Sequence, residues 1–340
     1  MSGELVAGWD VGGVNLKFAA VRDGAVVAVQ SQPFEIQHTP NDLVRALRAQ
    51  ARAASLPAGA RHAVTMTAEL SQLFRTKREG VAFVLDAVES AFPGDDIAVY
   101  TVDGSFVSTA NARRDPLRAA ASNWHATASV VARTWPNATL VDIGSTTTDV
   151  IPIAAGAVVA TGRTDPERLA NAELLYLGAV RTPVEAIVHD VPLGTALAGV
   201  SAEAFALSGD VHVWNGDLAA ADYQCATPDG RAVTREYVRE RLARIVCADR
   251  ELLDDHAIDR IAVHVADAQI ARTAAALARV RSHTTPAVPV VTAGLGAFVA
   301  ERAAERLGVP WASLGVTLGA DAARAAPAAA VALLRDRQIS

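Results

Sequence analysis

Two aspartates, each followed two residues later by a glycine, are the residues of this chain whose spacing points most directly to chemistry. Asp142 and Gly144 end an apolar run, and the hydroxyl residues Ser145, Thr146 and Thr147 follow them. This pattern predicts a strand, a tight turn and a second strand. Such a turn offers backbone N–H groups and hydroxyls to a phosphate, and a carboxylate to the metal ion that accompanies it. One match alone is weak, because Ser and Thr are also common in edge strands.

A second copy of the pattern lies near the N-terminus. Asp10 and Gly12 again follow an apolar run, Gly13 and Asn15 complete the turn, and Lys17 lies on the outgoing strand. We expect Asp10 and Asp142 to bind Mg²⁺, which prefers a few carboxylates together with phosphate oxygens. The Lys17 ammonium could reach a phosphate as a point charge, although a solvated strand lysine is the alternative. Two such hairpins suggest a duplicated architecture.

Two further sets of residues complete the predicted site. Asp149 is either an inward-facing acid or the polar face of a strand. Gly294 and Gly296 follow a short apolar run and are expected to admit a ligand's phosphate or nucleoside, the alternative being an ordinary strand-to-helix turn. The predicted catalytic residues are therefore Asp10, Lys17, Asp142 and Asp149. The predicted phosphate-binding residues are Gly12, Gly13, Asn15, Gly144, Ser145, Thr146, Thr147, Gly294 and Gly296.

Composition limits the class of protein. The 340 residues, 51% of them hydrophobic, are enough for one large or two ordinary compact domains. A net charge of −6 argues against nucleic acid as the main partner. The two cysteines and eight histidines lack the spacing of a zinc site, and no signal peptide or 18-residue apolar run is present. We expect a cytoplasmic protein without a membrane segment, and the sequence leaves a homodimer open.

The hydrophobic pattern predicts an α/β protein. Strands are expected at 4–11, 14–22, 25–32, 61–66 and 97–102, with helices at 42–54, 81–92 and 117–135. Asn137 and Pro152 are expected to bound the central hairpin, with a third strand at 156–160. Residues 173–188 are apolar and β-rich. Helices at 235–246 and 256–281, a strand at 288–292 and a last helix at 318–334, interrupted by Pro327, are expected to follow. The predicted domains are 1–135, onto which 318–340 packs back, and 136–317.

With these three motifs in place, the chain resembles the actin, sugar-kinase and Hsp70 superfamily. The motifs that carry the resemblance are Asp10–Gly12, Asp142–Gly144 and Val291–Gly296, and the run Gly144–Asp149 resembles the hydantoinase/oxoprolinase branch. The resemblance implies two duplicated ribonuclease H-like (actin-like ATPase) domains with a central cleft. It leaves ATP binding open, because no catalytic-base aspartate stands in a loop placed like that of the kinases, except Asp103 as a candidate.

A closer similarity is to a narrower group of about this length, linked to one-carbon metabolism through methanofuran and tetrahydromethanopterin cofactors. Residues 8–17, 142–152, 176–183 and 226–231 carry it. It implies a transferase that condenses an aminomethylfuran-methyl diphosphate with the phenol of tyramine, or of a tyrosine-like amine. Diphosphate leaves and an aryl ether forms. Mg²⁺ and cations would stabilise the departing diphosphate.

Several other residues are candidates to assist this reaction. The strand at 61–66 is expected to deliver Thr65, Thr67 and Glu69 to a loop, and Glu69, Asp103 and His125 are the candidates for the base that accepts the phenol proton. Tyr176 and Arg181 could line a substrate cleft, and Cys225 could be a nucleophile, although structural roles are the default for each. Two other functions stay open: an ATP-dependent small-molecule kinase or hydantoinase/oxoprolinase-like hydrolase, and a non-catalytic nucleotide-sensing protein.

Overall fold

A computed structural model describes residues 4–282 and 288–338 of the chain. The chain forms two compact units. The first comprises residues 1–140, 151–168 and 312–340, and the second comprises 141–150 and 169–311. The expected domains, 1–135 with 318–340 and 136–317, assign residues 136–140, 151–168 and 312–317 differently and stay a prediction.

The first unit is built on a six-stranded mixed sheet. Its strands are β1 (Val6–Val11), β2 (Asn15–Arg22), β3 (Ala25–Pro33), β4 (Arg61–Met66), β5 (Asp96–Tyr100) and β6 (Phe106–Ser108), in the order β3-β2-β1-β4-β5-β6. The first three are antiparallel neighbours, whereas β1, β4 and β5 run parallel. The strands predicted in this region are confirmed. Because β1, β4 and β5 are parallel, their carboxyl ends meet at one edge of the sheet.

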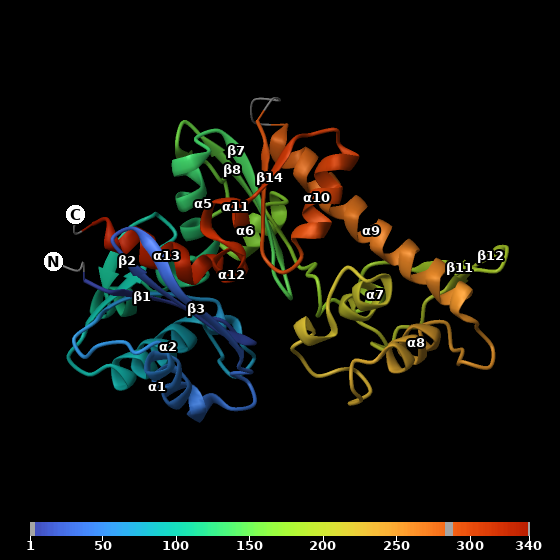
Figure 1. Ribbon diagram of the computed structural model, residues 1–340, viewed down its shortest axis with the longest axis horizontal. Helices are drawn as coiled ribbons and strands as arrows, with labels where there is room; N and C mark the ends of the chain where they lie inside the picture. Colours follow the sequence, from blue (N-terminus) through green and yellow to red (C-terminus); the bar gives the residue numbers. More distant parts are fainter. Residues whose placement is uncertain (1–3, 283–287, 339–340) are drawn as a thin grey trace. The chain divides into compact units, whose positions relative to one another are not determined.

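Helices cover both faces of this sheet. The helices of this unit are α1 (Leu43–Ala53), α2 (Lys77–Ala91), α3 (Thr109–Arg114), α4 (Pro116–Ala119), α5 (Asn123–Thr134), α11 (Leu314–Leu318), α12 (Ala320–Arg324) and α13 (Ala326–Asp336), and α6 (Asp165–Ala170) begins in it. Figure 1 shows α1 and α2 on the face of β1–β3 opposite to α13. The alanine-rich α13 lies very close to β1, since a Cβ placed on Gly8 would be only 2.0 Å from the Ala328 carbonyl oxygen. Trp9 and Phe18 are completely buried in the core on the other face.

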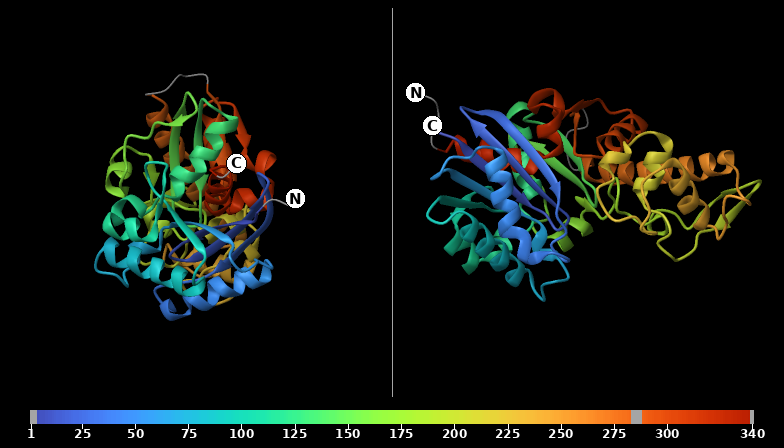
Figure 2. Two further views of the ribbon diagram at one scale, coloured as in Figure 1. Left: turned by 90° about the vertical axis from the view of Figure 1, so that its left-hand side faces the viewer. Right: turned by 60° about the horizontal axis from the view of Figure 1, so that its bottom comes forward.

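A second sheet has the order β10-β8-β7-β13-β14, with β9 pairing with β8. Its strands are β7 (Ala138–Ile143), β8 (Thr148–Ala154), β9 (Ala157–Val158), β10 (Leu174–Leu175), β13 (Val290–Ala293) and β14 (Trp311–Ser313). The second unit holds the hairpin β11 (Asp190–Leu193) and β12 (Ala196–Gly199) and the helices α7 (Ser208–Asn215), α8 (Arg235–Arg244), α9 (Asp255–Arg281) and α10 (Ala297–Arg306). Figure 2 shows α9, in orange, as one long helix.

Several predicted elements differ in the structure. The helix expected at 117–135 is divided into α4 and α5, because Ala121 adopts φ 48°, outside the helical region. Residues 173–188 form only the two-residue strand β10 and a short 3-10 helix at Val184–Ala186, so that prediction is largely wrong. Their apolar residues are buried without forming a sheet, as Leu177 and Val184 show.

Two prolines also behave differently from the prediction. Pro327 lies in the first turn of α13, so it begins that helix rather than interrupting a longer one. Proline is tolerated there because the first-turn N–H groups have no partner within the helix. Pro152 lies inside β8 rather than closing the hairpin, and its carbonyl accepts a hydrogen bond from the Val159 N–H at 3.0 Å. Residues 339–340 of the expected C-terminal segment lie outside the described residues.

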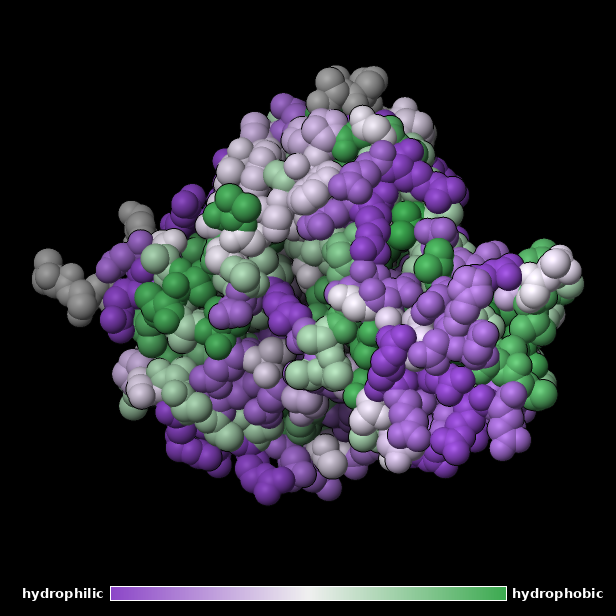
Figure 3. Space-filling view, turned by 45° about the vertical axis from the view of Figure 1, so that its right-hand side comes forward, coloured by the Kyte–Doolittle hydropathy of each residue, from purple (hydrophilic) through white to green (hydrophobic). Residues whose placement is uncertain are grey.

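The surface is mixed in character. On the face drawn in Figure 3, hydrophilic side chains cover a large area and hydrophobic ones form smaller groups. Large exposed hydrophobic residues include Leu197, Leu252 and Val316. Among the described residues, none of the helices combines the length and the apolar character needed to cross a bilayer.

Candidate functional site

The first predicted turn brings Asp10 and Lys17 together. Residues Asp10 and Lys17 are paired across β1 and β2, and Lys17 Nζ lies 3.4 Å from Asp10 Oδ2. The turn between the strands is closed by the Gly12 N–H, which donates to the Asn15 carbonyl at 3.0 Å. A Cβ on Gly12 would be 2.7 Å from that same oxygen, whereas one on Gly13 would have no atom within 4 Å. Gly12 is therefore required by the turn itself, while the space beside Gly13 is open.

The end of β4 lies beside this turn. The Thr67 N–H donates to the Val11 carbonyl at 3.0 Å, and Thr67 Oγ1 lies 3.5 Å from the Cβ position of Gly12. In open α/β sheets, ligands bind outside the carboxyl ends of parallel strands, where the strand order reverses. In this sheet β1 is that point, because β2 lies on one side of it and β4 on the other.

A buried carboxylate follows two residues after Thr67. Glu69 is only 2% exposed, and Lys77 Nζ lies 3.6 Å from its Oε1. Lys77 in turn donates to Asp165 Oδ2 at 2.6 Å. Burial raises the pKa of Glu69 to about 7, against the opposing effect of the Lys77 charge. Sequence inspection could not group these three residues, because Lys77 and Asp165 are 88 positions apart.

The other two candidate bases, Asp103 and His125, are each hydrogen-bonded to neighbouring side chains. Burial would raise the pKa of Asp103, but hydrogen bonds from Thr101, Arg118 and Ser105 lower it to about 2. His125 Nδ1 is hydrogen-bonded to the Tyr100 hydroxyl at 2.9 Å, and burial lowers the pKa of this imidazole to about 4.

The second predicted turn has the same local hydrogen bond as the first. The Gly144 N–H donates to the Thr147 carbonyl at 2.9 Å, again from the glycine to the residue three positions later. Asp142 lies at the end of β7, and the hydroxyls of Ser145 and Thr146 are 3.4 Å apart. Asp149 lies on β8 opposite Leu174 of β10 and is 8% exposed.

Residues 178–181 pack directly on the second turn. The Ala179 N–H donates to the Gly144 carbonyl at 2.9 Å, and the N–H groups of Val180 and Arg181 donate to the Ser145 carbonyl at 3.1 and 2.9 Å. A Cβ on Gly178 would lie 2.4 Å from both the Ser145 oxygen and the Thr146 nitrogen. The motif at 176–183 thus shapes the Ser145 turn, a role that the sequence did not predict. Tyr176, for which the sequence left a cleft position or a core position open, is 57% exposed and therefore not a core residue.

Two polar side chains donate hydrogen bonds to the backbone carbonyl of Gly178 and fix its position. Its carbonyl accepts from Ser208 Oγ at 2.9 Å and from Gln269 Nε2 at 3.0 Å. Gln269 Oε1 accepts from His212 Nε2 at 2.9 Å, and both of these side chains are fully buried. The turn is thereby tied to α7 and α9.

The loop at 293–296 also lies against this turn. Gly294 has φ 84°, and a Cβ there would be 2.4 Å from Asp142 Oδ1. The Gly296 N–H donates to the Ile143 carbonyl at 2.8 Å, and a Cβ on Gly296 would be 2.5 Å from Ile143 Cγ2. The structure therefore places Gly294 against Asp142 and Gly296 against Ile143, and close approach of protein atoms already requires glycine at these positions.

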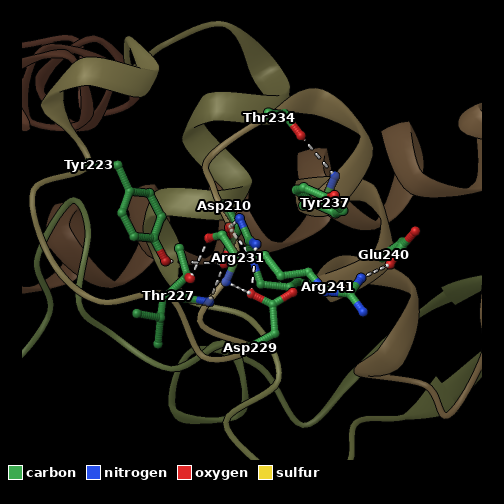
Figure 4. A network of polar contacts seen from close by, with 10 residues as sticks. Asp210, Tyr223, Thr227, Asp229, Arg231, Thr234, Tyr237, Glu240 and Arg241 are labelled. Carbon is green, nitrogen blue, oxygen red and sulfur yellow. Dashed lines mark hydrogen bonds and ion pairs between the residues drawn. The ribbon is translucent and has the colours of Figure 1, made fainter.

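The motif at 226–231 is fixed by a buried ionic network, drawn in Figure 4. Arg241 is 0% exposed, its Nε donates to Asp210 Oδ1 at 2.8 Å, and its guanidinium donates to Asp229 Oδ1 at 3.0 Å. Tyr223 donates to Asp210 Oδ2 at 3.4 Å. This network explains the motif as a structural anchor of the loop. Cys225 lies half-buried in the loop that precedes this motif.

The predicted site residues fall into two groups. Asp10, Gly12, Gly13, Asn15 and Lys17 lie together in the first unit, and Asp142, Gly144, Ser145, Thr146, Thr147, Asp149, Gly294 and Gly296 lie in the second. In residues 4–282 and 288–338, no group of three or more His, Cys, Asp or Glu side chains could hold a metal ion. A Mg²⁺ ion bound through one carboxylate and substrate phosphates needs no such group.

Comparison with known proteins gives the following similarities. The model of the hydantoinase/oxoprolinase family matches residues 61–338. A protein of Methanocaldococcus jannaschii named (4-{4-[2-(gamma-L-glutamylamino)ethyl]phenoxymethyl}furan-2-yl)methanamine synthase is 36% identical over 257 residues, covering 75% of this chain and 76% of that protein. A protein of the same name from Methanococcus vannielii is 41% identical over 113 residues, covering 33% of this chain and 50% of that protein.

The fold is similar to that of known sugar kinases. A ROK family glucokinase from Streptomyces griseus, solved with glucose and AMPPNP, aligns with a TM-score of 0.51 at 14% identity, covering 96% of this chain and 98% of that one. At this identity the comparison establishes the mixed α/β architecture of the actin-like and sugar-kinase proteins and nothing about the substrate.

Proposed function

Because the chain belongs to the hydantoinase/oxoprolinase family, we propose that it is the enzyme that joins an aminomethylfuran-methyl diphosphate to a phenolic acceptor, releasing diphosphate and forming an aryl ether. The observation that carries the proposal is the 36% identity, over three quarters of both chains, to a synthase of a phenoxymethylfuran product. Because the alignment covers about three quarters of both proteins, it supports the whole activity rather than that of one domain.

The relatives' product also indicates the acceptor. Its name places a γ-glutamylamino group on the ethyl chain of the phenol. We therefore take the acceptor to be γ-glutamyltyramine, which refines the earlier expectation of tyramine or a tyrosine-like amine.

The two turns supply groups suited to diphosphate. We propose that the Gly12–Gly13 turn and the Gly144–Thr147 turn are each phosphate-binding turns that offer N–H and hydroxyl groups, and that Asp10 and Asp142 are Mg²⁺ ligands, directly or through water. Bound Mg²⁺ would neutralise charge on the departing diphosphate. Lys17, held 3.4 Å from Asp10, would add a positive charge beside the same turn. Asp149 would act as a second acid near the Ser145 turn.

We also propose that the two halves are duplicated ribonuclease H-like domains, with limits 1–135 and 136–317 and the C-terminal helix packed on the first. The matching hydrogen bonds from Gly12 to Asn15 and from Gly144 to Thr147 support this. So do the matching positions of Asp10 and Asp142, each two residues before the glycine.

Mass spectrometry tests the activity. The protein, the furan diphosphate, γ-glutamyltyramine and Mg²⁺ should together yield the ether and diphosphate. Asp10→Asn and Asp142→Asn should each lower kcat/KM by about 10²-fold or more, because charge stabilisation in the transition state is lost. Asp86→Asn is the matched control, since that side chain is 70% exposed.

A failure to form ether would contradict the proposal. A second measurement then separates the alternatives. If ATP with Mg²⁺ raises the melting temperature and the furan diphosphate does not, the kinase or hydrolase alternative replaces the transferase, since only a ligand that prefers the folded state stabilises it.

A further inference from the structure

Ether formation requires a destination for one proton. As the phenol oxygen bonds to the furan methylene carbon, the bond from that carbon to the diphosphate oxygen breaks, and diphosphate leaves with the electron pair. The phenol O–H bond must break as well. A side chain that accepts this proton has to lie near the turn that holds the diphosphate, and it has to be unprotonated near neutral pH.

Two of the three candidate bases do not suit this task. Asp103 is paired with Arg118 and hydrogen-bonded by two hydroxyls, which lower its pKa to about 2. The imidazole of His125 is engaged with Tyr100, and burial lowers its pKa to about 4. Both groups are too weakly basic to accept a proton from a phenol, whose usual pKa is about 10.

Glu69 lies in the right place. It follows Thr67 by two residues. The Thr67 N–H donates to the Val11 carbonyl at the end of β1, and Thr67 Oγ1 lies 3.5 Å from where a Cβ on Gly12 would stand. Two residues span at most about 7 Å of chain, so the Glu69 backbone lies close to that turn. The turn of 3-10 helix at Ala68–Leu70 carries Glu69 at the carboxyl edge of the sheet.

The Glu69 carboxylate is buried beside a single cation. The residue is 2% exposed, and Lys77 Nζ lies 3.6 Å from Oε1, a long separation for a hydrogen bond. Burying an ionisable group in this way costs free energy, which is unusual unless the group has a task. Its position is rigid, because a Cβ on Gly80 of α2 would lie 2.5 Å from the Glu69 Cα.

From this geometry we infer that Glu69 is the catalytic base that accepts the phenol proton, and that Lys77 and Asp165 are positioning residues that set its charge. The inference rests on the proposed transferase function. Lys77 on α2 faces Glu69 at 3.6 Å and favours the ionised carboxylate, while Asp165 on α6 holds Lys77 at 2.6 Å. After the ether has formed, the phenol proton is on Glu69, and it passes to solvent before the next turnover.

The basicity of Glu69 agrees with this role. Burial raises its pKa to about 7, with Lys77 lowering it and Asp165 raising it again. A general base works best when its pKa lies near the working pH.

The test compares Glu69→Gln with the wild-type enzyme on acceptors of different phenol acidity. Glu69→Gln should lower kcat by about 10²-fold or more, while the KM for the furan diphosphate stays within threefold. With γ-glutamyl-3,5-difluorotyramine, whose phenol is more acidic, the deficit should shrink at least tenfold. Glu89→Gln is the matched control, because Glu89 is an acid on the surface of α2, 41% exposed and paired with Arg113.

Two outcomes would overturn the inference. Activity of Glu69→Gln within threefold of the wild type would exclude Glu69 as the base, and so would a deficit that is equal for both acceptors. A melting temperature no lower than that of the wild type and an unchanged affinity for the furan diphosphate show that the variant is folded. If the wild-type enzyme forms no ether, the proposed function itself is wrong. This outcome is distinct from a wrong assignment of Glu69, in which the wild-type enzyme is active.

Lys77→Met gives a second, independent reading. Removing the ammonium should move the acid limb of the kcat/KM profile to higher pH, because Glu69 would then hold its proton more tightly. A purely structural role for Lys77 would lower activity at every pH without moving the limb, and that result would contradict the assignment of Lys77.

Discussion

Gly178 should be the position where a single methyl group does the most damage to the second turn. In Gly178→Ala the new Cβ would lie 2.4 Å from the Ser145 oxygen and the Thr146 nitrogen, so the turn or the segment must move. Both contacts are with backbone, which cannot rotate away as a flexible side chain can. A contact between carbon and these atoms normally needs roughly 3.4 Å, so the required shift is on the order of 1 Å.

The magnitude follows from what that shift disrupts. Overpacking alone costs about 1–3 kcal/mol. The three hydrogen bonds from residues 179–181 to the carbonyls of Gly144 and Ser145 would be strained as well, each contributing about 1 kcal/mol when intact. We expect Gly178→Ala to lower the free energy of unfolding by about 2–4 kcal/mol. A displacement of 1 Å in a binding turn should also lower kcat/KM by about 10²-fold.

The assay is urea unfolding followed by steady-state kinetics, with Gly199→Ala as the control. Gly199 lies in β12, and a Cβ there would have no atom within 4 Å. The control should unfold like the wild type. If Gly178→Ala and Gly199→Ala unfold within 0.5 kcal/mol of each other, or if Gly178→Ala keeps wild-type kcat/KM, the steric reasoning is refuted.

Three other outcomes are expected. Arg241→Met should lower the free energy of unfolding by about 3–5 kcal/mol because it leaves Asp210 buried without its cation, whereas Arg302→Met, which removes a surface partner of Asp217, should cost less than about 1 kcal/mol; urea unfolding compares them, and equal losses would contradict the argument. His125 has a pKa lowered to about 4, so the unfolded chain binds its proton first, and stability should fall as pH drops from about 6.5 towards 4; melting curves of His125→Asn should show a shallower fall. Mg²⁺ alone should leave the melting temperature unchanged, and Mg²⁺ with diphosphate should raise it, because the described residues lack a metal-binding cluster of three such ligands.

Local patterns were enough to predict the first strands of the sheet and both turns. Strands β1, β2 and β3 follow from apolar runs broken by glycine, and the Asp-x-Gly spacing at Asp10 and Asp142 identified the turns that the structure contains. These features depend on neighbours in sequence, so short-range patterns determine them.

Features that depend on distant residues could not be predicted in this way. Lys77 pairs with both Glu69 and Asp165. This requires α2 and α6 to be packed at the carboxyl edge of the sheet. The packing of Gly178 on Ser145 is equally invisible, because a glycine in a loop has many local explanations. Helix limits near the C-terminus also failed, since Gly319 and Ala325 divide the segment into α11, α12 and α13.

The cost of burying the Glu69 carboxylate affects how such a chain can evolve. A leucine at this buried position would remove the desolvation of an acid and should make the protein more stable while ending catalysis. Selection for stability alone would therefore discard Glu69. Lineages that no longer make the ether should replace it with an apolar residue, and lineages that keep the acid should also keep a cation at the position of Lys77.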